Sequence, residues 1–183
     1  MIRFKISSGG ILKSLTMIFR FFRGGEHSPR SKLEINWGDG SSKDTVQRNS
    51  VSPISGQDAQ KNVYIINHTF AGAGTFRVTM EDPNRNGGIV NIGGATNSDQ
   101  FPFCIATEVV ISPFLGINNS VQFNDCPCPE LACINKRYCY NPQATDPDGD
   151  SLSYSLVPCL GFDCLSMATP AVYQYPSNFG GNI

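Results

Sequence analysis

Three aspartates at alternate positions form the group of residues in this chain that is best placed to do chemistry. Asp146, Asp148 and Asp150 lie in the run Asp-Pro-Asp-Gly-Asp. Carboxylates that converge around a bend repel one another, and a hard cation such as Ca²⁺ would relieve that repulsion. The run is not an EF-hand loop, because Gly149 stands at its fourth position and no Glu stands at its twelfth. Further oxygens could come from three residues elsewhere, Asn118, Asn119 and Asp125. The alternative is a solvated turn that opens a strand.

All seven cysteines lie in the second half of the chain. Their density in a Pro-rich stretch predicts disulfides and an oxidising compartment, and the odd number leaves one thiol free or paired outside the chain. We expect Cys133 to pair with Cys159, although spacing alone does not fix connectivity. The alternative is a zinc site from Cys126, Cys128, Cys133 and Cys139, against which the Cys-Pro-Cys spacing argues. The chain has no Cys-x-x-Cys redox motif.

Two segments alternate between apolar and polar residues with the period of two that marks a half-buried β-strand. Residues 33–37 place Leu, Ile and Trp on one face, and residues 75–81 place Phe, Val and Met on one face. We expect the second strand to return and pack on the first, with Trp37 in the core. A Gly-Asp-Gly turn at residues 38–40 follows the first strand, and Asp39 can hydrogen-bond its own backbone there.

The rest of the chain also predicts strands and turns, and no stretch carries a clear helical pattern. Further strands are expected at residues 11–23, 62–66, 89–92, 103–111 and 151–156. For residues 11–23 the alternative is a basic amphipathic helix on a membrane surface, but the Phe, Ile and Thr content favours a strand. Residues 43–60 are polar and predict a loop with at most a short edge strand around Val46. The expected fold class is therefore all-β.

The Trp-Gly-Asp-Gly turn resembles the signature of the PKD domain, a small immunoglobulin-like β-sandwich. The later pieces of that signature are His68-Thr-Phe and Gly74-Thr-Phe-Arg-Val. The match is not complete, because Trp37 directly precedes the Gly-Asp-Gly. The resemblance implies that His68 is a structural residue, hydrogen-bonded near the Asp39 turn. It also implies a spacer or binding module of a secreted protein, since PKD domains are not catalysts.

The order of motifs across most of residues 30–160 is similar to one group of surface proteins of gliding bacteria in the Bacteroidota. These are large, secreted, multi-module chains. The resemblance implies a PKD-like β-sandwich over residues 1–112, of which 1–30 match poorly, then a linker at 113–120. A partial cadherin- or immunoglobulin-like β module follows at 121–183. In cadherin-like bacterial repeats, calcium bound by a similar Asp-x-Asp-Gly-Asp motif often stiffens the junctions between modules.

We expect the chain to be a fragment of a longer exported protein. Only about 65 residues follow the linker, whereas an immunoglobulin-like sandwich takes about 100. A convincing signal peptide is not seen, because Ser7-Ser8-Gly9-Gly10 interrupts any apolar stretch near the start. The location implied by the resemblance and the cysteines is extracellular or at the cell surface.

Composition and missing motifs exclude several classes of function. Residues 33–183 are mildly acidic, which argues against nucleic-acid binding. No apolar run approaches the ~20 residues that a membrane helix needs, so no membrane insertion is expected. The chain has two His and lacks the common hydrolase and phosphate-binding motifs, so we expect no enzyme activity.

The function that we expect is that of a non-catalytic structural or adhesion module in a secreted or cell-surface bacterial protein. Its partners would be other modules of the same protein and extracellular protein or glycan ligands. The alternative is a carbohydrate-binding accessory module of a secreted polysaccharide hydrolase. Exposed aromatics in a row would support it, and the candidates are Tyr138, Tyr140, Tyr173 and Tyr175.

Overall fold

The structure is a computed structural model of the chain. It describes residues 2–6, 12–22, 31–53, 55, 59–83, 85, 87–93, 97–114, 118–123, 141, 143–155, 157–161, 164 and 173–174, with the backbone alone for 2–6, 12–22 and 59. Several residues singled out from the sequence lie outside these ranges: Cys126, Cys128, Cys133, Cys139, Asp125, Tyr138, Tyr140 and Tyr175.

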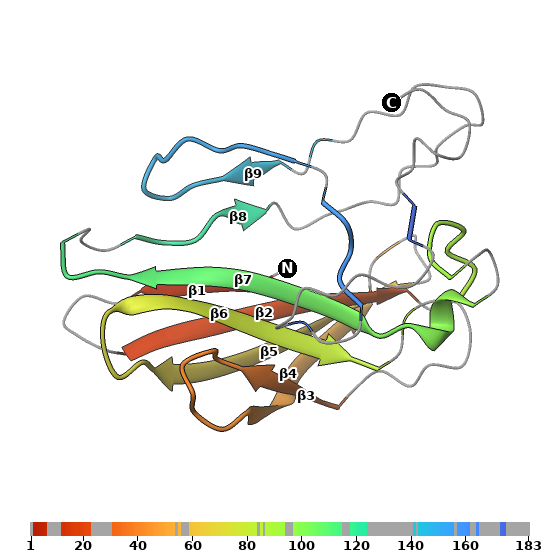
Figure 1. The fold of residues 1–183 in the computed structure, drawn as a ribbon, viewed down its shortest axis with the longest axis horizontal. Coiled ribbons are helices and arrows are strands. Elements are labelled where there is room, and N and C mark those ends of the chain that lie inside the picture. Colours follow the sequence, from red (N-terminus) through yellow and green to blue (C-terminus); the bar gives the residue numbers. More distant parts are fainter. Residues whose placement is uncertain are drawn as a thin grey trace.

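The described part of the chain consists of β-strands, one short 3-10 turn and loops, which confirms the all-β prediction (Figure 1). The strands are β1 (Ile2–Ile6), β2 (Leu12–Phe22), β3 (Lys32–Asn36), β4 (Asp44–Pro53), β5 (Ala59–Thr69), β6 (Gly74–Asp82), β7 (Phe103–Ile111), β8 (Gln122–Phe123) and β9 (Ala144–Thr145), and the 3-10 turn is η1 (Ser98–Gln100). The first seven form one antiparallel sheet in the order β1-β2-β5-β4-β3-β6-β7, and β8 pairs with β9.

The large sheet curls at β4. The start of β4, as far as Gln47, pairs with β3, whereas the part from Arg48 to Pro53 pairs with β5. The register shifts between Arg48 and Ser50, and a bulge of this kind bends a strand and increases its twist. The bend brings β5 to face β3 and β6, so that Tyr64 of β5 joins the same buried cluster as the side chains of those strands.

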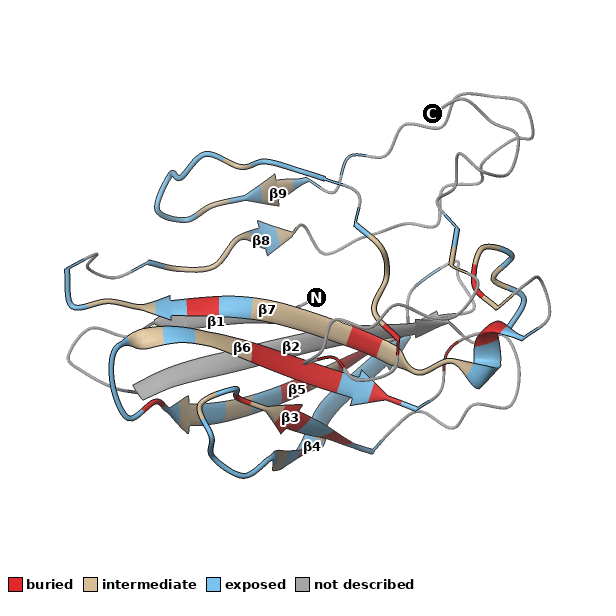
Figure 2. Ribbon diagram, viewed as in Figure 1, coloured by how far each residue is buried: buried red, intermediate tan, exposed pale blue. Residues whose placement is uncertain are grey.

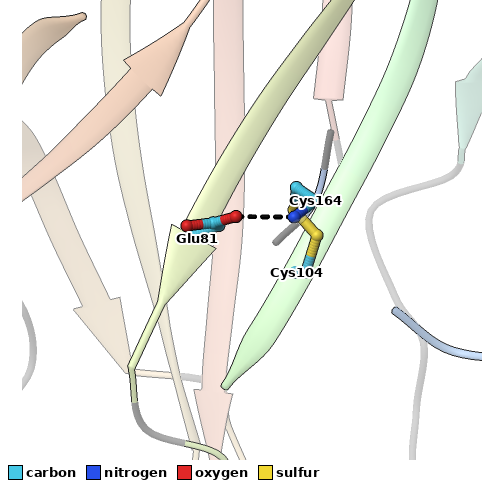
Figure 3. Close-up of side chains that lie close together, drawn as sticks. All are labelled: Glu81, Cys104 and Cys164. Atoms are coloured by element: carbon cyan, nitrogen blue, oxygen red, sulfur yellow. Dashed lines mark hydrogen bonds between the residues drawn. A yellow bond between two sulfur atoms is a disulfide. The ribbon is translucent and has the colours of Figure 1, made fainter. Parts of the chain in front are cut away.

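The chain after β9 returns to the large sheet. Leu160 forms an isolated antiparallel bridge with Cys104 on β7, and Cys104 is joined by a disulfide to Cys164 (Figure 3). The two-module division at residues 113–120 stays a prediction. The described residues on its two sides are tied together at this point.

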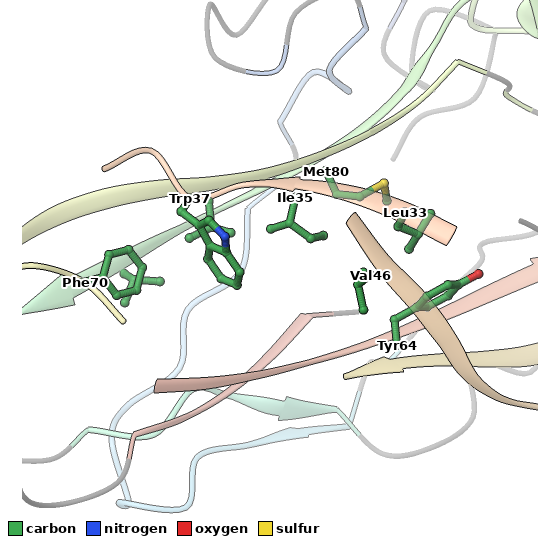
Figure 4. Close-up of a cluster of buried hydrophobic side chains, with 9 residues drawn as sticks. Leu33, Ile35, Trp37, Val46, Tyr64, Phe70 and Met80 are labelled. Carbon is green, nitrogen blue, oxygen red and sulfur yellow. The ribbon is translucent and has the colours of Figure 1, made fainter. Parts of the chain in front are cut away.

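The core lies inside the curl, and its members come from β3 to β7 and the loop after β5. Leu33 and Ile35 of β3 alternate with the exposed Glu34, as the sequence pattern predicts, and Met80 of β6 pairs with Ile35 (Figures 2 and 4). The complete cluster is Leu33, Ile35, Trp37, Val46, Tyr64, Phe70, Val78, Met80 and Val109. Burying each large apolar side chain contributes roughly 1.5–3 kcal/mol, so this cluster is the main source of stability.

Four predicted strands are confirmed, at 11–23, 32–37, 75–81 and 103–111, and the strand at 62–66 is longer than predicted. The prediction of a loop at residues 43–60 was wrong, because β4 occupies much of it. Val46 is the one residue of β4 that is fully buried, and the others are mostly exposed. Such a strand is held by backbone hydrogen bonds to neighbours on both sides, which leave no apolar pattern in the sequence.

Two other predicted strands were also wrong where the structure describes them. Residues 89–92 form a turn in which the Ile92 N–H donates to the Ile89 carbonyl. Residues 151–155 alternate well but form no strand. Alternation gives a segment the propensity for a strand, but a strand also needs a neighbour to pair with.

We predict that Ile35→Ala lowers the free energy of unfolding by about 2–5 kcal/mol, because it leaves a cavity in the centre of the core. The neighbouring Glu34→Ala, on the exposed face of the same strand, should change it by no more than about 0.5 kcal/mol. Urea unfolding of the oxidised protein measures both values. Equal losses in the two variants would contradict the assignment of the faces of β3.

Candidate functional site

The Gly-Asp-Gly turn after β3 brings Asp39 against His68 of β5. Asp39 Oδ2 lies 2.7 Å from His68 Nε2, and Asp39 Oδ1 accepts hydrogen bonds from the backbone N–H of Ser41 at 3.0 Å and its hydroxyl at 2.6 Å. The side chains of His68 and Asp39 are only 11% and 8% exposed. Gly38 has a φ of 71°, and a Cβ there would collide with the backbone of Arg77, so the turn requires glycine at this position.

The His68 ring is also stacked on Trp37, with ring centroids 4.1 Å apart and planes 9° from parallel. Phe70 meets both rings edge-on. Trp37 Nε1 donates a hydrogen bond to Asp44 Oδ2 at 2.7 Å, and that oxygen lies 3.8 Å from His68 Nδ1. Trp37 Nε1, both oxygens of Asp39 and His68 Nε2 therefore each have a hydrogen-bond partner within the cluster.

The pKa of Asp39 is lowered from 3.8 to about 2. Burial works in the opposite direction and is the largest single effect, but the hydrogen bonds from Ser41 and His68 and the charge of His68 together outweigh it. Asp39 is therefore ionised near neutral pH and can only accept hydrogen bonds, so His68 Nε2 carries the proton that they share.

This cluster contains Ser, His and Asp but not in the order that nucleophilic catalysis requires. In a catalytic triad the imidazole lies between the hydroxyl and the carboxylate, where it can take the hydroxyl proton. Here the carboxylate of Asp39 lies between them and accepts from both Ser41 and His68. The structure thus packs Trp37, Asp39 and His68 against one another, and we call these three residues the Trp37 clasp. The sequence analysis predicted a structural role for all three.

We predict that Asp39→Asn lowers the free energy of unfolding near neutral pH by about 1–3 kcal/mol, because it weakens a buried charge-assisted pair. A carboxyl whose pKa is depressed by folding stabilises the fold fully above the unfolded value of 3.8, and this stabilisation is lost as the pH falls through about 2. The wild-type protein should therefore lose more stability in acid than the variant.

Urea unfolding curves at several pH values from neutral to strongly acid would measure this difference. Asp99→Asn, at an exposed position in η1, is the matched control. Parallel pH profiles for the wild type and Asp39→Asn would contradict the role assigned to Asp39.

The aspartate run lies in the turn after β9, and each of its carboxylates accepts hydrogen bonds. Asp148 accepts the backbone N–H of Asn119 and, at 2.9 Å, its side-chain amide. Asn118 donates to Asp150 at 3.2 Å. Asp146 Oδ1 accepts the backbone N–H groups of Asp148 and Asp150, at 2.8 and 3.3 Å. Asp148 and Asp150 therefore hold the segment before β8 through hydrogen bonds to Asn119 and Asn118.

The three aspartates act as hydrogen-bond acceptors in this structure. Among the described residues, the one group of three His, Cys, Asp or Glu whose ligand atoms all lie within 4.8 Å is Glu81, Cys104 and Cys164. The three aspartates do not converge to that degree. N–H donors bind both oxygens of Asp148 and one oxygen each of Asp146 and Asp150. Asn118 and Asn119, expected to supply oxygens to a cation, instead donate N–H groups to Asp150 and Asp148. Calcium binding stays a prediction from the sequence.

We expect the melting temperature of the wild-type protein to be the same in millimolar Ca²⁺ and in excess chelator, because N–H donors already bind both oxygens of Asp148, the central carboxylate of the run. Asp148→Asn should lower the melting temperature by about 2–4 °C in both solutions, since it weakens the hydrogen bonds from Asn119 to residue 148. Thermal unfolding followed by circular dichroism measures both. A calcium-dependent rise that Asp148→Asn abolishes would instead establish the calcium site.

The disulfide joins Cys104 to Cys164, with Cα atoms 5.7 Å apart. Cys164 is fully buried, and its backbone N–H donates to Glu81 Oε1 at 2.6 Å (Figure 3). The predicted Cys133–Cys159 pair is corrected, since Cys159 is a free thiol in the structure. Leu160 is bridged to Cys104, so its neighbour Cys159 points away from Cys104, and Cys164 pairs with Cys104 instead.

Cys159 lies instead beside Arg85, a residue that the sequence analysis did not single out. Arg85 is 8% exposed, and its Nη2 donates to the carbonyls of Pro102 at 2.8 Å and Leu160 at 2.7 Å. Burial raises the pKa of the Cys159 thiol, although the guanidinium of Arg85 acts to lower it. Cys159 is half-buried, and a thiol with a raised pKa stays protonated and is a weak nucleophile. In the sequence, Arg85 is distinguished only as a charged residue within a run of turn-forming residues, which does not predict its burial.

Comparison of the chain with protein-family models, with curated proteins and with solved structures finds no match. The likeness to PKD domains and to surface proteins of gliding bacteria therefore rests on the sequence motifs. No helix in the described part of the chain is long and apolar enough to span a membrane.

Proposed function

We propose that this chain is a non-catalytic structural or adhesion module of a secreted or cell-surface bacterial protein, with a PKD-like, immunoglobulin-like sandwich as its main unit. The observation that carries the proposal is the buried Cys104–Cys164 disulfide. Disulfides form and persist in oxidising compartments and are rare in the bacterial cytosol. This one joins the segment after β9 to the edge strand β7, which is a structural role.

The Trp37 clasp supports a structural role for the residues that most resemble catalytic ones. Asp39 and His68 are almost fully buried and bonded to each other. A general base needs access to the proton that it removes, and His68 Nε2 is already occupied by Asp39. The proposed partners are accordingly other modules of the same protein and extracellular protein or glycan ligands.

The carbohydrate-binding alternative depends on a row of exposed tyrosines. Of the four candidates only Tyr173 lies among the described residues, and it is half-buried. Tyr154 is more exposed, at 63%, but it lies in a different segment. No observation on the described residues favours this alternative over the structural role.

We predict that the disulfide closes only when the chain is exported, and that it then stabilises the protein. Its loop spans 60 residues, so the loss of chain entropy in the unfolded state corresponds to about 4 kcal/mol. Peptide mapping without reduction should find the Cys104–Cys164 link in protein exported to a bacterial periplasm. Reductant should lower the melting temperature of that protein.

Cys159→Ser is the matched control, because it removes a free thiol and should keep the reductant-sensitive melt. Cys104→Ser with Cys164→Ser should abolish the sensitivity that this pair causes. Exported protein in which both cysteines remain reduced would overturn the argument for an oxidising compartment.

A further inference from the structure

β7 lies at the edge of the large sheet, and in the part of the chain that the structure describes no strand pairs with most of its outer side. It pairs with β6 along its full length on one side. On the other side, the described chain makes only the isolated bridge between Cys104 and Leu160. The Ile105 carbonyl is also in contact with Cys164 Sγ. From Ala106 to Ile111 the outward N–H and C=O groups have no strand partner among the described residues and can pair with another strand.

This free edge forms one wall of a cleft of about 420 Å³. Thr107 and Glu108 of β7 line one side, and Phe123 of β8 with the preceding residues 118–121 lines the other. The aspartate turn and Leu152 close it. In Figure 1, β8 runs next to the free edge of β7, with the aspartate turn beyond it. An extended segment in this cleft would lie along β7.

The cleft is acidic. Glu108, Asp146 and Asp150 line it, and no Lys or Arg is among the described residues that do. The hydrogen bond that Asp150 accepts comes from a neutral amide, which leaves its charge in place. Arg77 lies 3.4 Å from Glu108, but Glu108 is 64% exposed, and an exposed pair of this kind offsets little of the charge.

Apolar groups lie beside the carboxylates. Val121, Phe123 and Leu152 line the cleft, and Val110 of β7 is 54% exposed next to it. Side chains of an added strand point alternately to the two faces of the sheet. Glu108 and Val110 are two residues apart, so they lie on the same, exposed face of β7. Lys or Arg at alternate positions of an added strand would lie on that face, beside Glu108.

We propose that this cleft binds an extended peptide segment with Lys or Arg at alternate positions, which adds to β7 as a further strand. Backbone hydrogen bonds to the strand edge provide affinity in this mode of recognition, and the alternating side chains provide selectivity. The inference deepens the proposed function and rests on it in one respect, namely that the segment comes from another module or another surface protein.

The experiment uses the full oxidised chain and a fluorescein-labelled peptide of alternating Lys and Val, six residues long to match the edge from Ala106 to Ile111. Fluorescence anisotropy should show saturable binding, and a peptide of alternating Glu and Val should not bind. Glu108→Gln combined with Asp150→Asn should weaken binding by about tenfold or more, because two charge-assisted contacts are lost. Glu34→Gln combined with Asp99→Asn removes the same charge elsewhere and should leave binding unchanged.

A backbone control separates strand addition from charge attraction. Two further peptides carry N-methyl groups, one on every Val and the other on every Lys, and both keep the full positive charge. The one whose methylated edge faces β7 cannot donate hydrogen bonds and should lose binding. Equal binding by both methylated peptides would overturn the proposal, and so would full binding by the Glu108 and Asp150 variant.

Other occupants of the cleft would also overturn it. One such result is Ca²⁺ binding by calorimetry with no binding of the peptide. Another is a concentration-dependent dimer, seen by light scattering, that excludes the peptide. A failure here is distinguishable from a failure of the proposed function, because the disulfide map and the reductant-sensitive melt do not depend on the cleft.

Discussion

The bend in β4 is the constraint on which the rest of this structure depends. A seven-stranded sheet that stayed open would expose the apolar faces of β3 and β6 to water. The register shift between Arg48 and Ser50 lets one strand pair with β3 at its start and with β5 at its end. Tyr64 can then pack against the β3 and β6 side chains and close the core.

The Trp37 clasp, at the end of β3, uses polar groups to complete that core. Trp37 ends the buried row of β3 and is covered by His68 and Phe70. The indole N–H and the imidazole both need acceptors when they are buried, and Asp44 and Asp39 supply them. The resulting network is satisfied internally, so its low exposure and shifted Asp39 pKa are consequences of packing. A perturbed pKa often marks an active site, but here it marks a turn.

The return of the chain after β9 fixes only one end of the edge strand β7. Arg85, the Cys104–Leu160 bridge and the disulfide hold the chain at the start of β7. At the other end, the asparagines before β8 are held by the aspartate turn and not by β7. Within the described ranges, no strand pairs with the edge between these two attachments, although natural sheets usually cover or block such edges. An open edge beside an acidic cleft is the basis for the partner proposed above.

The sequence by itself determined the class of the fold and the strands whose faces differ in polarity. Leu33, Ile35 and Met80 follow a period of two because one face of their strands is buried. The alternation in the sequence therefore predicts which face is buried. The same reasoning could not find β4, whose stability comes from backbone pairing on both sides. It also wrongly predicted a strand at residues 151–156. Strand propensity is a property of the segment itself, whereas a strand also needs a pairing partner from elsewhere in the chain. Only the tertiary structure decided that Cys104 pairs with Cys164, that Arg85 is buried, and that N–H donors occupy the aspartate run. Each of these features depends on contacts between residues that are far apart in the sequence. Local patterns in a single sequence do not show which distant residues come into contact.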